Sequence, residues 1–356
     1  MKSPVSSLAL EAGWIAYQLF YHEDRDRALR EFITPSLGDL WRQERIHSFF
    51  FVRYALGGPH LRLRVRVCPN RGEEVAAILE RDAAVFLARH PSTATWSEDK
   101  ILRQNRTLLA HDREEEDCGI YPDNTFLPVP PRFEIERYGG PALLGASLDF
   151  FALSSLFVLR FLALHAVTPP ARRLPVILRI LARQAFGLAT DGDDLLGLLA
   201  YAGGSPAPLA SFALRGDQVF ETRKETFRTL LAAEVGALAQ GPSLETEAAR
   251  RLRRAIAGAD AAIRQRIVWS QMHMTANRLG LLNPEEVYIS RLLWRSVRDL
   301  ADRSPGLWRD LCDVLASNVG GCGDVVELDD LLAPVMTSCF EPLLFNIPPV
   351  ETSTHA

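Results

Sequence analysis

The sequence contains few cysteines and no paired cysteine motif. Among its 356 residues there are five cysteines, an odd number, and no two of them are spaced as CxxC. A disulfide framework or a structural zinc site is therefore not expected, and the composition predicts a protein of the reducing cytoplasm. The five residues are Cys68, Cys118, Cys312, Cys322 and Cys339.

Excess charge and uninterrupted apolar runs are also absent. The formal net charge is -4, so no general nucleic-acid partner is expected. The N-terminal stretch MKSPVSSLALEAGW lacks the continuous apolar core of a signal peptide. The most apolar region, Leu143–Val167, is interrupted by Asp149 and Arg160. This interruption favours one or two buried helices over a membrane span, so no membrane partner is expected either.

Several motifs of familiar enzymes are missing. GGPHLR precedes a predicted strand and not a helix, so it is neither a phosphate-binding loop nor a dinucleotide fingerprint. The sequence has no HExxH motif, no metal-ligand cluster, no evident Ser-His-Asp order and no diagnostic pair of carboxylates. It therefore predicts no bound metal and no organic cofactor.

The first 70 residues contain the clearest strand signals. Aromatic and β-branched residues predict strands at Trp14–Tyr21, Phe49–Tyr54 and His60–Val67. The last two are separated only by the Gly-rich turn Leu56–Pro59, which predicts a hairpin.

Helical spacing follows between and after these strands. Helices are predicted at Asp24–Trp41, which Pro35 interrupts, and at Gly72–Ala88. Residues 92–132 are polar and contain the acidic run Glu114–Asp117. This composition predicts a long surface excursion of the kind that forms lids and binding loops.

From Gly140 onward the pattern is almost wholly helical. One long helical pattern runs over Leu244–Leu279, and Asn283 followed by Pro284 predicts a capped helix start. Strands and helices therefore segregate along the chain. This segregation predicts an α+β fold, with an early antiparallel sheet and hairpin packed against a largely helical C-terminal half. Residues 1–356 are expected to form a single module, sheet-rich over 10–140 and helix-rich over 141–340.

The predicted strand His60–Val67 has two different faces. Alternate residues of a strand point to opposite sides, so its leucines and valines face the core, and His60, Arg62, Arg64 and Arg66 share the other face. Like charges this close repel one another and need a partner. One interpretation is a solvated face paired with acids of a neighbouring strand. The other is a site for a carboxylate or an oxyanion, since arginine binds these groups through forked donors.

A second group of polar residues lies on the predicted C-terminal helices. His273 and Asn277 are one helical turn apart, so Asn277 could orient the imidazole of His273. Histidine titrates near neutral pH and is a candidate general acid–base, although a lone histidine is more often hydrogen-bonded within a core. Tyr288, with Ser290 nearby, offers a hydroxyl donor for an oxyanion, but such a tyrosine more often closes a core.

A third group is the segment Glu134–Gly140, which combines charged residues with two glycines. It predicts a buried charge network at a bend of the chain, with Arg137 at its centre. By residue type a structural role is favoured over a catalytic one.

In order, the motifs W-x-x-Y-x-x-F-Y, F-F-F-V-R-Y-A-L-G-G-P-H-L-R-L-R, E-I-E-R-Y-G-G and H-M-x-x-N-R-L-G resemble one known family across nearly the whole chain. This family is the C-terminal module of lantibiotic dehydratases, also described as the thiopeptide-type bacteriocin biosynthesis domain. The resemblance implies chemistry on a ribosomally made precursor peptide, with a leader and a dehydrated, azole-bearing core. Other enzymes of the same pathway are further expected partners.

The resemblance leaves three activities open. A stand-alone thiopeptide pyridine synthase joins two dehydroalanines by a formal [4+2] aza-cycloaddition, then loses water and expels the leader to leave a pyridine-centred macrocycle. A stand-alone lyase eliminates glutamate from glutamylated Ser or Thr. A non-catalytic protein would only bind the leader for a partner enzyme. The absence of a large N-terminal glutamylation region and the spacing from Asn277 to Tyr288 favour the pyridine synthase.

The resemblance also suggests roles for individual residues. The expected catalytic residues are Tyr288, His273 and Ser290. The expected substrate-binding residues are His60, Arg62, Arg64, Arg53, Arg137 and Asn277. Leaders in this family tend to be acidic, so a cationic groove would help to capture them. The candidate residues for such a groove are Arg250, Arg251, Arg253 and Arg254, although a solvated helix face is the favoured interpretation of these four.

Overall fold

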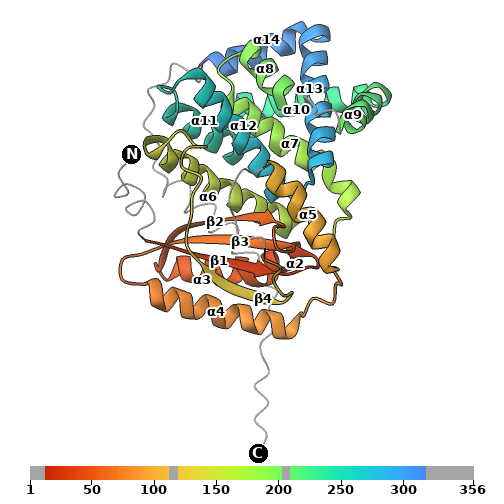
Figure 1. Ribbon diagram of the computed structural model, residues 1–356. Coiled ribbons are helices and arrows are strands. Elements are labelled where there is room, and N and C mark those ends of the chain that lie inside the picture. The colour runs from red at the N-terminus through yellow and green to blue at the C-terminus, as the bar shows by residue number, and fades with distance from the viewer. Residues whose placement is uncertain (1–12, 112–118, 203–208, 318–356) are drawn as a thin grey trace, which may run out of the picture.

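The protein consists of a small sheet at one end and a helical half stacked on it (Figure 1). The structure is a computed structural model that describes residues 13–111, 119–202 and 209–317. Every strand among these residues lies before residue 130, and from residue 141 onward the described secondary structure is helical. The predicted α+β fold is therefore confirmed.

The sheet has four antiparallel strands in the order β2-β3-β1-β4. The predicted hairpin is formed by β2 and β3, and β3 also pairs with β1, so it lies inside the sheet. Gly57 and Gly58 in the connecting turn have φ values of +81° and +126°, which favour glycine. The strands are β1 (Trp14–Phe20), β2 (Ile46–Tyr54), β3 (His60–Val67) and β4 (Thr125–Val129).

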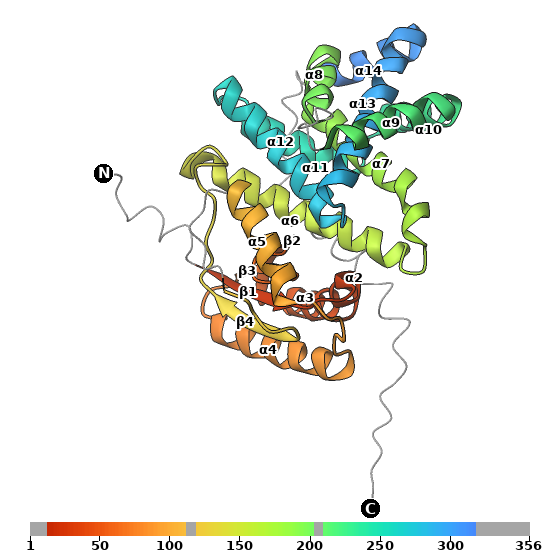
Figure 2. The same ribbon diagram turned by 45° about the vertical axis from the view of Figure 1, so that its right-hand side comes forward.

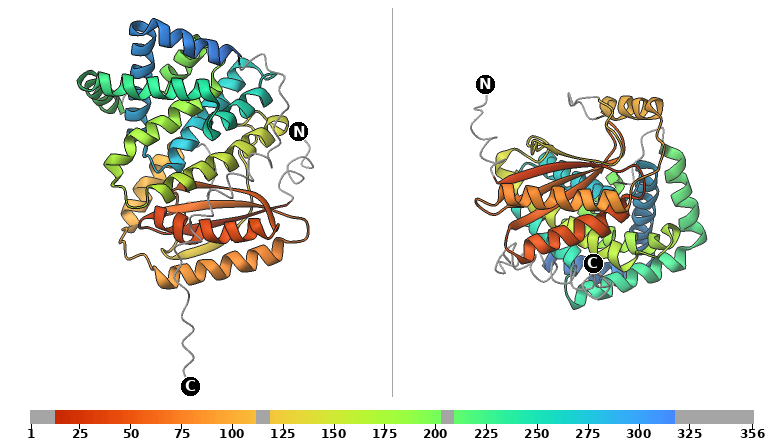
Figure 3. Two further views of the ribbon diagram at one scale, coloured as in Figure 1. Left: turned by 180° about the vertical axis from the view of Figure 1, so that it is seen from behind. Right: turned by 90° about the horizontal axis from the view of Figure 1, so that it is seen from below.

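One face of the sheet packs against the first helices. Leu61, Leu63 and Val65 of β3 are at most 1% exposed, as the alternation of this strand predicts. The helices on this side lie beneath the sheet (Figure 3), and the first of them also contacts the helical half through the ion pair of Asp26 with Arg173. They are α2 (Arg25–Ala28), a π-helical turn η1 (Leu29–Ile33), α3 (Thr34–Arg42) and α4 (Gly72–Arg89).

The segment 92–132 is more ordered than a surface excursion. It contains α5 (Glu98–His111) and the edge strand β4, so the prediction of a long loop is wrong in this respect. β4 was missed because it is short and contains Pro128, which an edge strand tolerates. Asn105 of α5 accepts a hydrogen bond from the Gly57 N–H at 2.9 Å and so ties α5 to the hairpin turn. The acidic run Glu114–Asp117 lies outside the described residues.

The helical half is built on α6, which lies between the sheet and the remaining helices (Figures 1 and 2). The apolar region Leu143–Val167 is thus mostly one buried helix. Among the described residues α6 is also the one helix long and apolar enough to cross a membrane, and 72% of its apolar window is buried inside the protein. The helices are α6 (Pro141–Leu164), α7 (Pro170–Leu188), α8 (Gly192–Ala202), α9 (Ala210–Thr222), α10 (Lys224–Gln240), α11 (Leu244–Ala255), α12 (Ala261–Arg278), α13 (Asn283–Arg303) and α14 (Pro305–Ser317).

Two predicted helix boundaries differ from the structure. The long pattern Leu244–Leu279 is divided into α11 and α12, and Asp260 caps α12 by accepting the Ala262 N–H at 2.8 Å. Asn283 is not the cap of α13. The Glu285 carboxylate instead accepts the Leu282 N–H at 2.9 Å and so satisfies one free donor at the helix start.

Helices α7 and α11 approach each other most closely at Gly187. A Cβ atom placed there would lie 2.4 Å from the Thr246 carbonyl oxygen and 2.6 Å from the Ala249 Cβ. We expect Gly187→Ala to lower the free energy of unfolding by about 1–3 kcal/mol, measured by urea denaturation, because the helices must separate. Gly236→Ala on α10 is the matched control, since its Cβ would meet nothing within 4 Å. That variant is expected to gain about 0.5–1 kcal/mol from helix propensity.

Candidate functional site

The polar face of β3, here called the arginine face, consists of His60, Arg62, Arg64 and Arg66. The four residues differ in exposure, since His60 and Arg64 are buried, Arg62 is half-buried and Arg66 is exposed. The Arg62 guanidinium lies 3.7 Å from the centre of the Tyr54 ring. The interpretation as a simple solvated face therefore fits Arg66 only.

An apolar cluster adjoins the arginine face. Phe50 and Val52 of β2 are the cross-strand neighbours of Arg64 and Arg62, so they lie on the same side of the sheet. Both pack in a cluster that α6 and the segment 133–138 complete and to which Met274 of α12 adds its side chain. The arginine face, the E-I-E-R-Y-G-G segment and α12 thus meet around one cluster.

His60 is a neutral, buried side chain. Its Nδ1 lies 2.9 Å from the Gly58 carbonyl oxygen, which can only accept, so Nδ1 carries the hydrogen. The ring packs between Phe20 and Tyr54. Burial lowers the pKa of His60 to about 3, and the nearby Arg62 acts in the same direction. His60 therefore shapes the hairpin turn, and the positive charge of this face comes from its arginines.

This burial predicts an acid-sensitive fold. Below pH 6.5 the unfolded state binds a proton at His60 that the folded state refuses until about pH 3, so stability is lost as the pH falls through this window. The expected slope is up to about 1.4 kcal/mol per pH unit. In urea titrations, His60→Phe should flatten this slope, whereas His47→Phe, at an exposed position of β2, should leave it unchanged. An equal slope in parent and His60→Phe would contradict the assignment.

His273 on α12 is held by a carboxylate. Its Nδ1 lies 2.8 Å from Glu286 Oε2 on the first turn of α13, and its ring stacks on Trp269 with an interplanar angle of 10°. Both side chains keep partial exposure, 25% for His273 and 18% for Glu286. Because Glu286 occupies Nδ1, Nε2 is the atom that can exchange a proton with a bound molecule.

The prediction that Asn277 orients this imidazole is wrong. Asn277 instead bonds the backbone of Arg53 on β2, where Oδ1 accepts the N–H at 2.9 Å and Nδ2 donates to the carbonyl at 2.8 Å. Glu286 was missed because the NPEE sequence was interpreted only as a helix start. Its partner is 13 residues away on another helix, a contact that no helical spacing reveals.

Arg137 connects the E-I-E-R-Y-G-G segment to α12. Its Nε donates to Ser270 Oγ at 3.1 Å, and its Nη1 pairs with Glu134 at 2.9 Å. Ser270 and His273 are three residues apart and so are neighbours on the helix surface. The predicted bend is present, since the following Gly139 and Gly140 have φ values of +83° and +87°. The prediction that the charge network is buried is wrong, because the side chains of Arg137 and Glu134 are 30% and 40% exposed.

Arg53 lies on the opposite side of the sheet from the arginine face, because its cross-strand partner is Leu61. Its Nη2 pairs with Asp26 at 2.6 Å, and Asp26 also pairs with Arg173 of α7 at 2.9 Å. The structure thus places Arg53 in an ion-pair link between sheet and helices, apart from Arg62 and Arg64.

Tyr288 and Ser290 project from α13 in different directions. Tyr288 is two residues beyond Glu286, about 200° around the helix, and its backbone packs against Gly216 of α9. Burial raises the pKa of the Tyr288 hydroxyl, while Arg215 and Arg223 oppose the shift. Ser290 is buried one turn beyond Glu286 on the same side. Tyr288 is therefore separated from His273.

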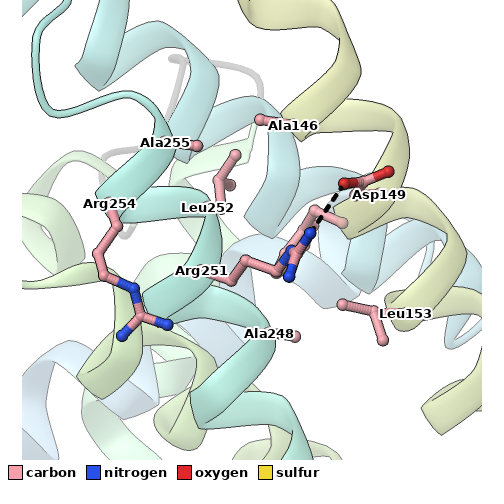
Figure 4. A pocket seen from close by; sticks show the side chains of 9 residues that line it. Ala146, Asp149, Leu153, Ala248, Arg251, Leu252, Arg254 and Ala255 are labelled. Carbon is pink, nitrogen blue, oxygen red and sulfur yellow. Dashed lines mark ion pairs between the residues drawn. The ribbon is translucent and has the colours of Figure 1, made fainter. Parts of the chain in front are cut away.

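A cavity of about 310 Å³ lies between α6 and α11. Arg251 reaches across it toward Asp149, with 3.6 Å between the charged atoms, and Arg254 lines the same cavity (Figure 4). Arg250 and Arg253 are buried, and Arg253 donates to the Ala189 carbonyl. The four arginines are thus neither one cationic groove nor one solvated face, and none of the expected site residues lines this cavity.

The comparison with protein families identifies the class. The sequence model of the family described as lantibiotic biosynthesis dehydratase C-term matches residues 14–297, so the chain belongs to this family. Membership places it among enzymes that modify ribosomally made peptides. A comparison with curated proteins gives no match.

Solved structures share the fold. The pyridine synthase TbtD from thiomuracin biosynthesis matches with a TM-score of 0.66 and 20% identity, over 82% of this chain and 99% of that one. TsrL matches with a TM-score of 0.56 and 17% identity, over 85% of this chain and 98% of that one. The tRNA-dependent lantibiotic dehydratase MibB from Microbispora sp. 107891 matches with a TM-score of 0.53 and 22% identity, over 85% of this chain and 29% of that one.

Proposed function

We propose that this protein is a pyridine synthase, which joins two dehydroalanines of a leader-bearing peptide in a formal [4+2] aza-cycloaddition. The observation that carries the proposal is the His273–Glu286 pair, a proton carrier three residues from Ser270, which Arg137 bonds. The next residue, Met274, packs in the cluster that borders the arginine face. The similarity to TbtD supports it, since the shared fold spans 99% of that protein and 82% of this chain.

In the proposed reaction, the enzyme first moves a proton within the substrate. The amide of one dehydroalanine becomes an imidic acid when its nitrogen loses a proton and its oxygen gains one. We assign this transfer to Nε2 of His273, with the Glu286 carboxylate stabilising the imidazolium that forms in between. Arg62 and Arg64 would donate to the amide oxygens as the charge on them develops.

Ring formation then requires the two alkenes to be held together. Two new C–C bonds form, because the two ends of the 2-azadiene are both carbon atoms and each joins one carbon of the second alkene. The remaining double bond of the new ring is a C=N bond, and no oxidant is consumed. Holding the reacting groups in contact can by itself contribute several kcal/mol to lowering the barrier. Loss of water and expulsion of the leader as a carboxamide leave the aromatic pyridine, and both steps again need the proton carrier.

Glutamate elimination is the second candidate reaction, because the same histidine and arginine side chains could carry it out. His273 could remove the α-proton of a glutamylated residue while Arg62 and Arg64 hold the departing glutamate carboxylates. The similarity to MibB keeps this candidate in place.

Mass spectrometry separates the candidates. The purified protein is incubated in parallel with a dehydrated, azole-bearing precursor and with a glutamylated precursor. We expect an intact leader ending in carboxamide, together with a pyridine-containing macrocycle, from the first peptide only. Loss of glutamate from the second peptide with no change in the first would assign elimination instead. Binding of both peptides without any mass change would leave a leader-binding scaffold.

A further inference from the structure

The outer edge of the sheet, along β2, has its backbone hydrogen-bonding groups satisfied by side chains at two residues. β2 is a terminal strand in the sheet order, so alternate residues direct their N–H and C=O groups away from β3. At Phe51 the N–H donates to Ser155 Oγ of α6 at 3.2 Å, and the carbonyl accepts from Arg278 Nε at 2.9 Å. At Arg53 the Asn277 carboxamide takes both groups.

The Asn277 carboxamide behaves here as a peptide group would in a neighbouring strand. It accepts from the N–H and donates to the carbonyl of the same residue, which is the reciprocal pairing of an antiparallel ladder. A side chain of β2 also bonds the backbone of α12, because Arg53 Nε donates to the Arg278 carbonyl at 3.0 Å. The last turn of α12 is thus fixed to one point of the sheet from both sides.

Arg278 shows that this attachment is made at a cost to stability. The side chain is fully buried, and its guanidinium lies 4.5 Å from the centre of the Phe151 ring. Over the residues that the structure describes, no carboxylate forms an ion pair with it. Removing an arginine from water without an acidic partner is unfavourable, and the bond to the Phe51 carbonyl offsets only part of this cost.

His273 lies one turn before Asn277 on the same helix, and Met274 beside it packs into the cluster that borders the arginine face. We propose that Asn277 and Arg278 are positioning residues, which hold α12 against β2 so that His273 stands at a fixed distance from Arg62 and Arg64. This role rests on the proposed function of His273 as proton carrier. It predicts that loosening the attachment lowers turnover more than substrate binding.

The kinetic experiment uses the full chain with the peptide that the parent converts. Asn277→Asp is isosteric and keeps the acceptor for the Arg53 N–H, but it places a carboxylate oxygen against the Arg53 carbonyl. We expect kcat to fall about 10–100-fold with KM changed less than about 3-fold, since a misplacement of about 1 Å costs this much. Gly187→Ala, assayed well below its Tm, is the control for general destabilisation and is expected to keep kcat. A parent-like kcat in Asn277→Asp would overturn the proposal.

A distance measurement tests the same role without relying on activity. Spin labels at His47→Cys on β2 and Gln265→Cys on α12, both exposed positions, report the separation of sheet and helix in a protein whose five native cysteines are replaced by serine. With Asn277→Asp added, the distance distribution is expected to shift or broaden by a few Å relative to the parent pair. An unchanged, narrow distribution in this variant would refute the attachment. A shifted distribution in a protein that converts no peptide would instead count against the proposed function alone.

Discussion

Replacing His273 by alanine is expected to lower kcat by about 10²–10⁴-fold while the protein remains folded, because the proton carrier is lost. The imidazole is partly exposed and touches Trp269 and Glu286 at the surface of α12, so its removal leaves little cavity. The measurement is the rate of product formation by mass spectrometry, with the Tm recorded in parallel. A kcat within 3-fold of the parent would remove His273 from the mechanism.

Glu286→Gln is the companion variant. Glutamine keeps the size of the side chain and one hydrogen-bonding oxygen, but it no longer carries the charge that stabilises an imidazolium. We expect kcat to fall about 10–100-fold, less than for His273→Ala, and the double variant to be no worse than His273→Ala alone. Glu285→Gln, which alters the neighbouring exposed acid, is the control and should change kcat little. Full additivity of the two losses would contradict a coupled pair.

A large stability loss from a single charge change is expected at Asp26. Burial alone would raise the pKa of Asp26, but Arg53 and Arg173 outweigh it and lower the pKa below its ordinary value. Asp26→Asn leaves two poorly exposed guanidinium groups without their shared carboxylate. We expect it to lower the free energy of unfolding at neutral pH by about 3 kcal/mol, measured by urea denaturation.

The pH dependence gives this prediction a second test. Because the folded pKa of Asp26 is depressed, its contribution is complete above the unfolded pKa and disappears as the pH falls through the folded pKa. The difference between parent and Asp26→Asn should therefore shrink on strong acidification. Asp39→Asn, which breaks an exposed ion pair with Arg42, is the control and should cost less than about 1 kcal/mol. If Asp26→Asn and Asp39→Asn lowered the free energy of unfolding equally, the Asp26 link would contribute no more stability than an exposed ion pair.

Local chemistry predicted the sheet well. β3 alternates leucine or valine with arginine without interruption, and a strand period of two places these residues on opposite faces whatever surrounds them. The hairpin followed from Gly57 and Gly58, which allow the turn. The order of four motifs indicated the family, because each is long enough to be specific in combination.

The site was harder to predict because its contacts join distant elements. Asn277 appeared to serve His273 because the two are one turn apart, but helical spacing says only that they are neighbours, not which partner each faces. In the structure, Asn277 is hydrogen-bonded to the backbone of β2, and His273 is hydrogen-bonded to Glu286. Tyr288 and His273 were both expected to be catalytic, yet Tyr288 projects from α13 toward α9, away from the side that Glu286 presents to His273. Such pairings depend on how helices pack, which residue type and spacing do not determine.

The side-chain closure of β2 limits how a peptide can be recognised. Many proteins capture an extended peptide by letting it join a sheet as an additional strand, which reads the peptide backbone and tolerates most sequences. At Phe51 and Arg53 this route is occupied, and the opposite edge, β4, is five residues long and contains Pro128, which has no N–H to offer. At these two edges a substrate cannot join the sheet as a further strand, so we expect side chains to hold it. Its selection then depends on where its carbonyl and carboxylate oxygens lie, so peptides of different sequence that share this spacing should compete for the protein.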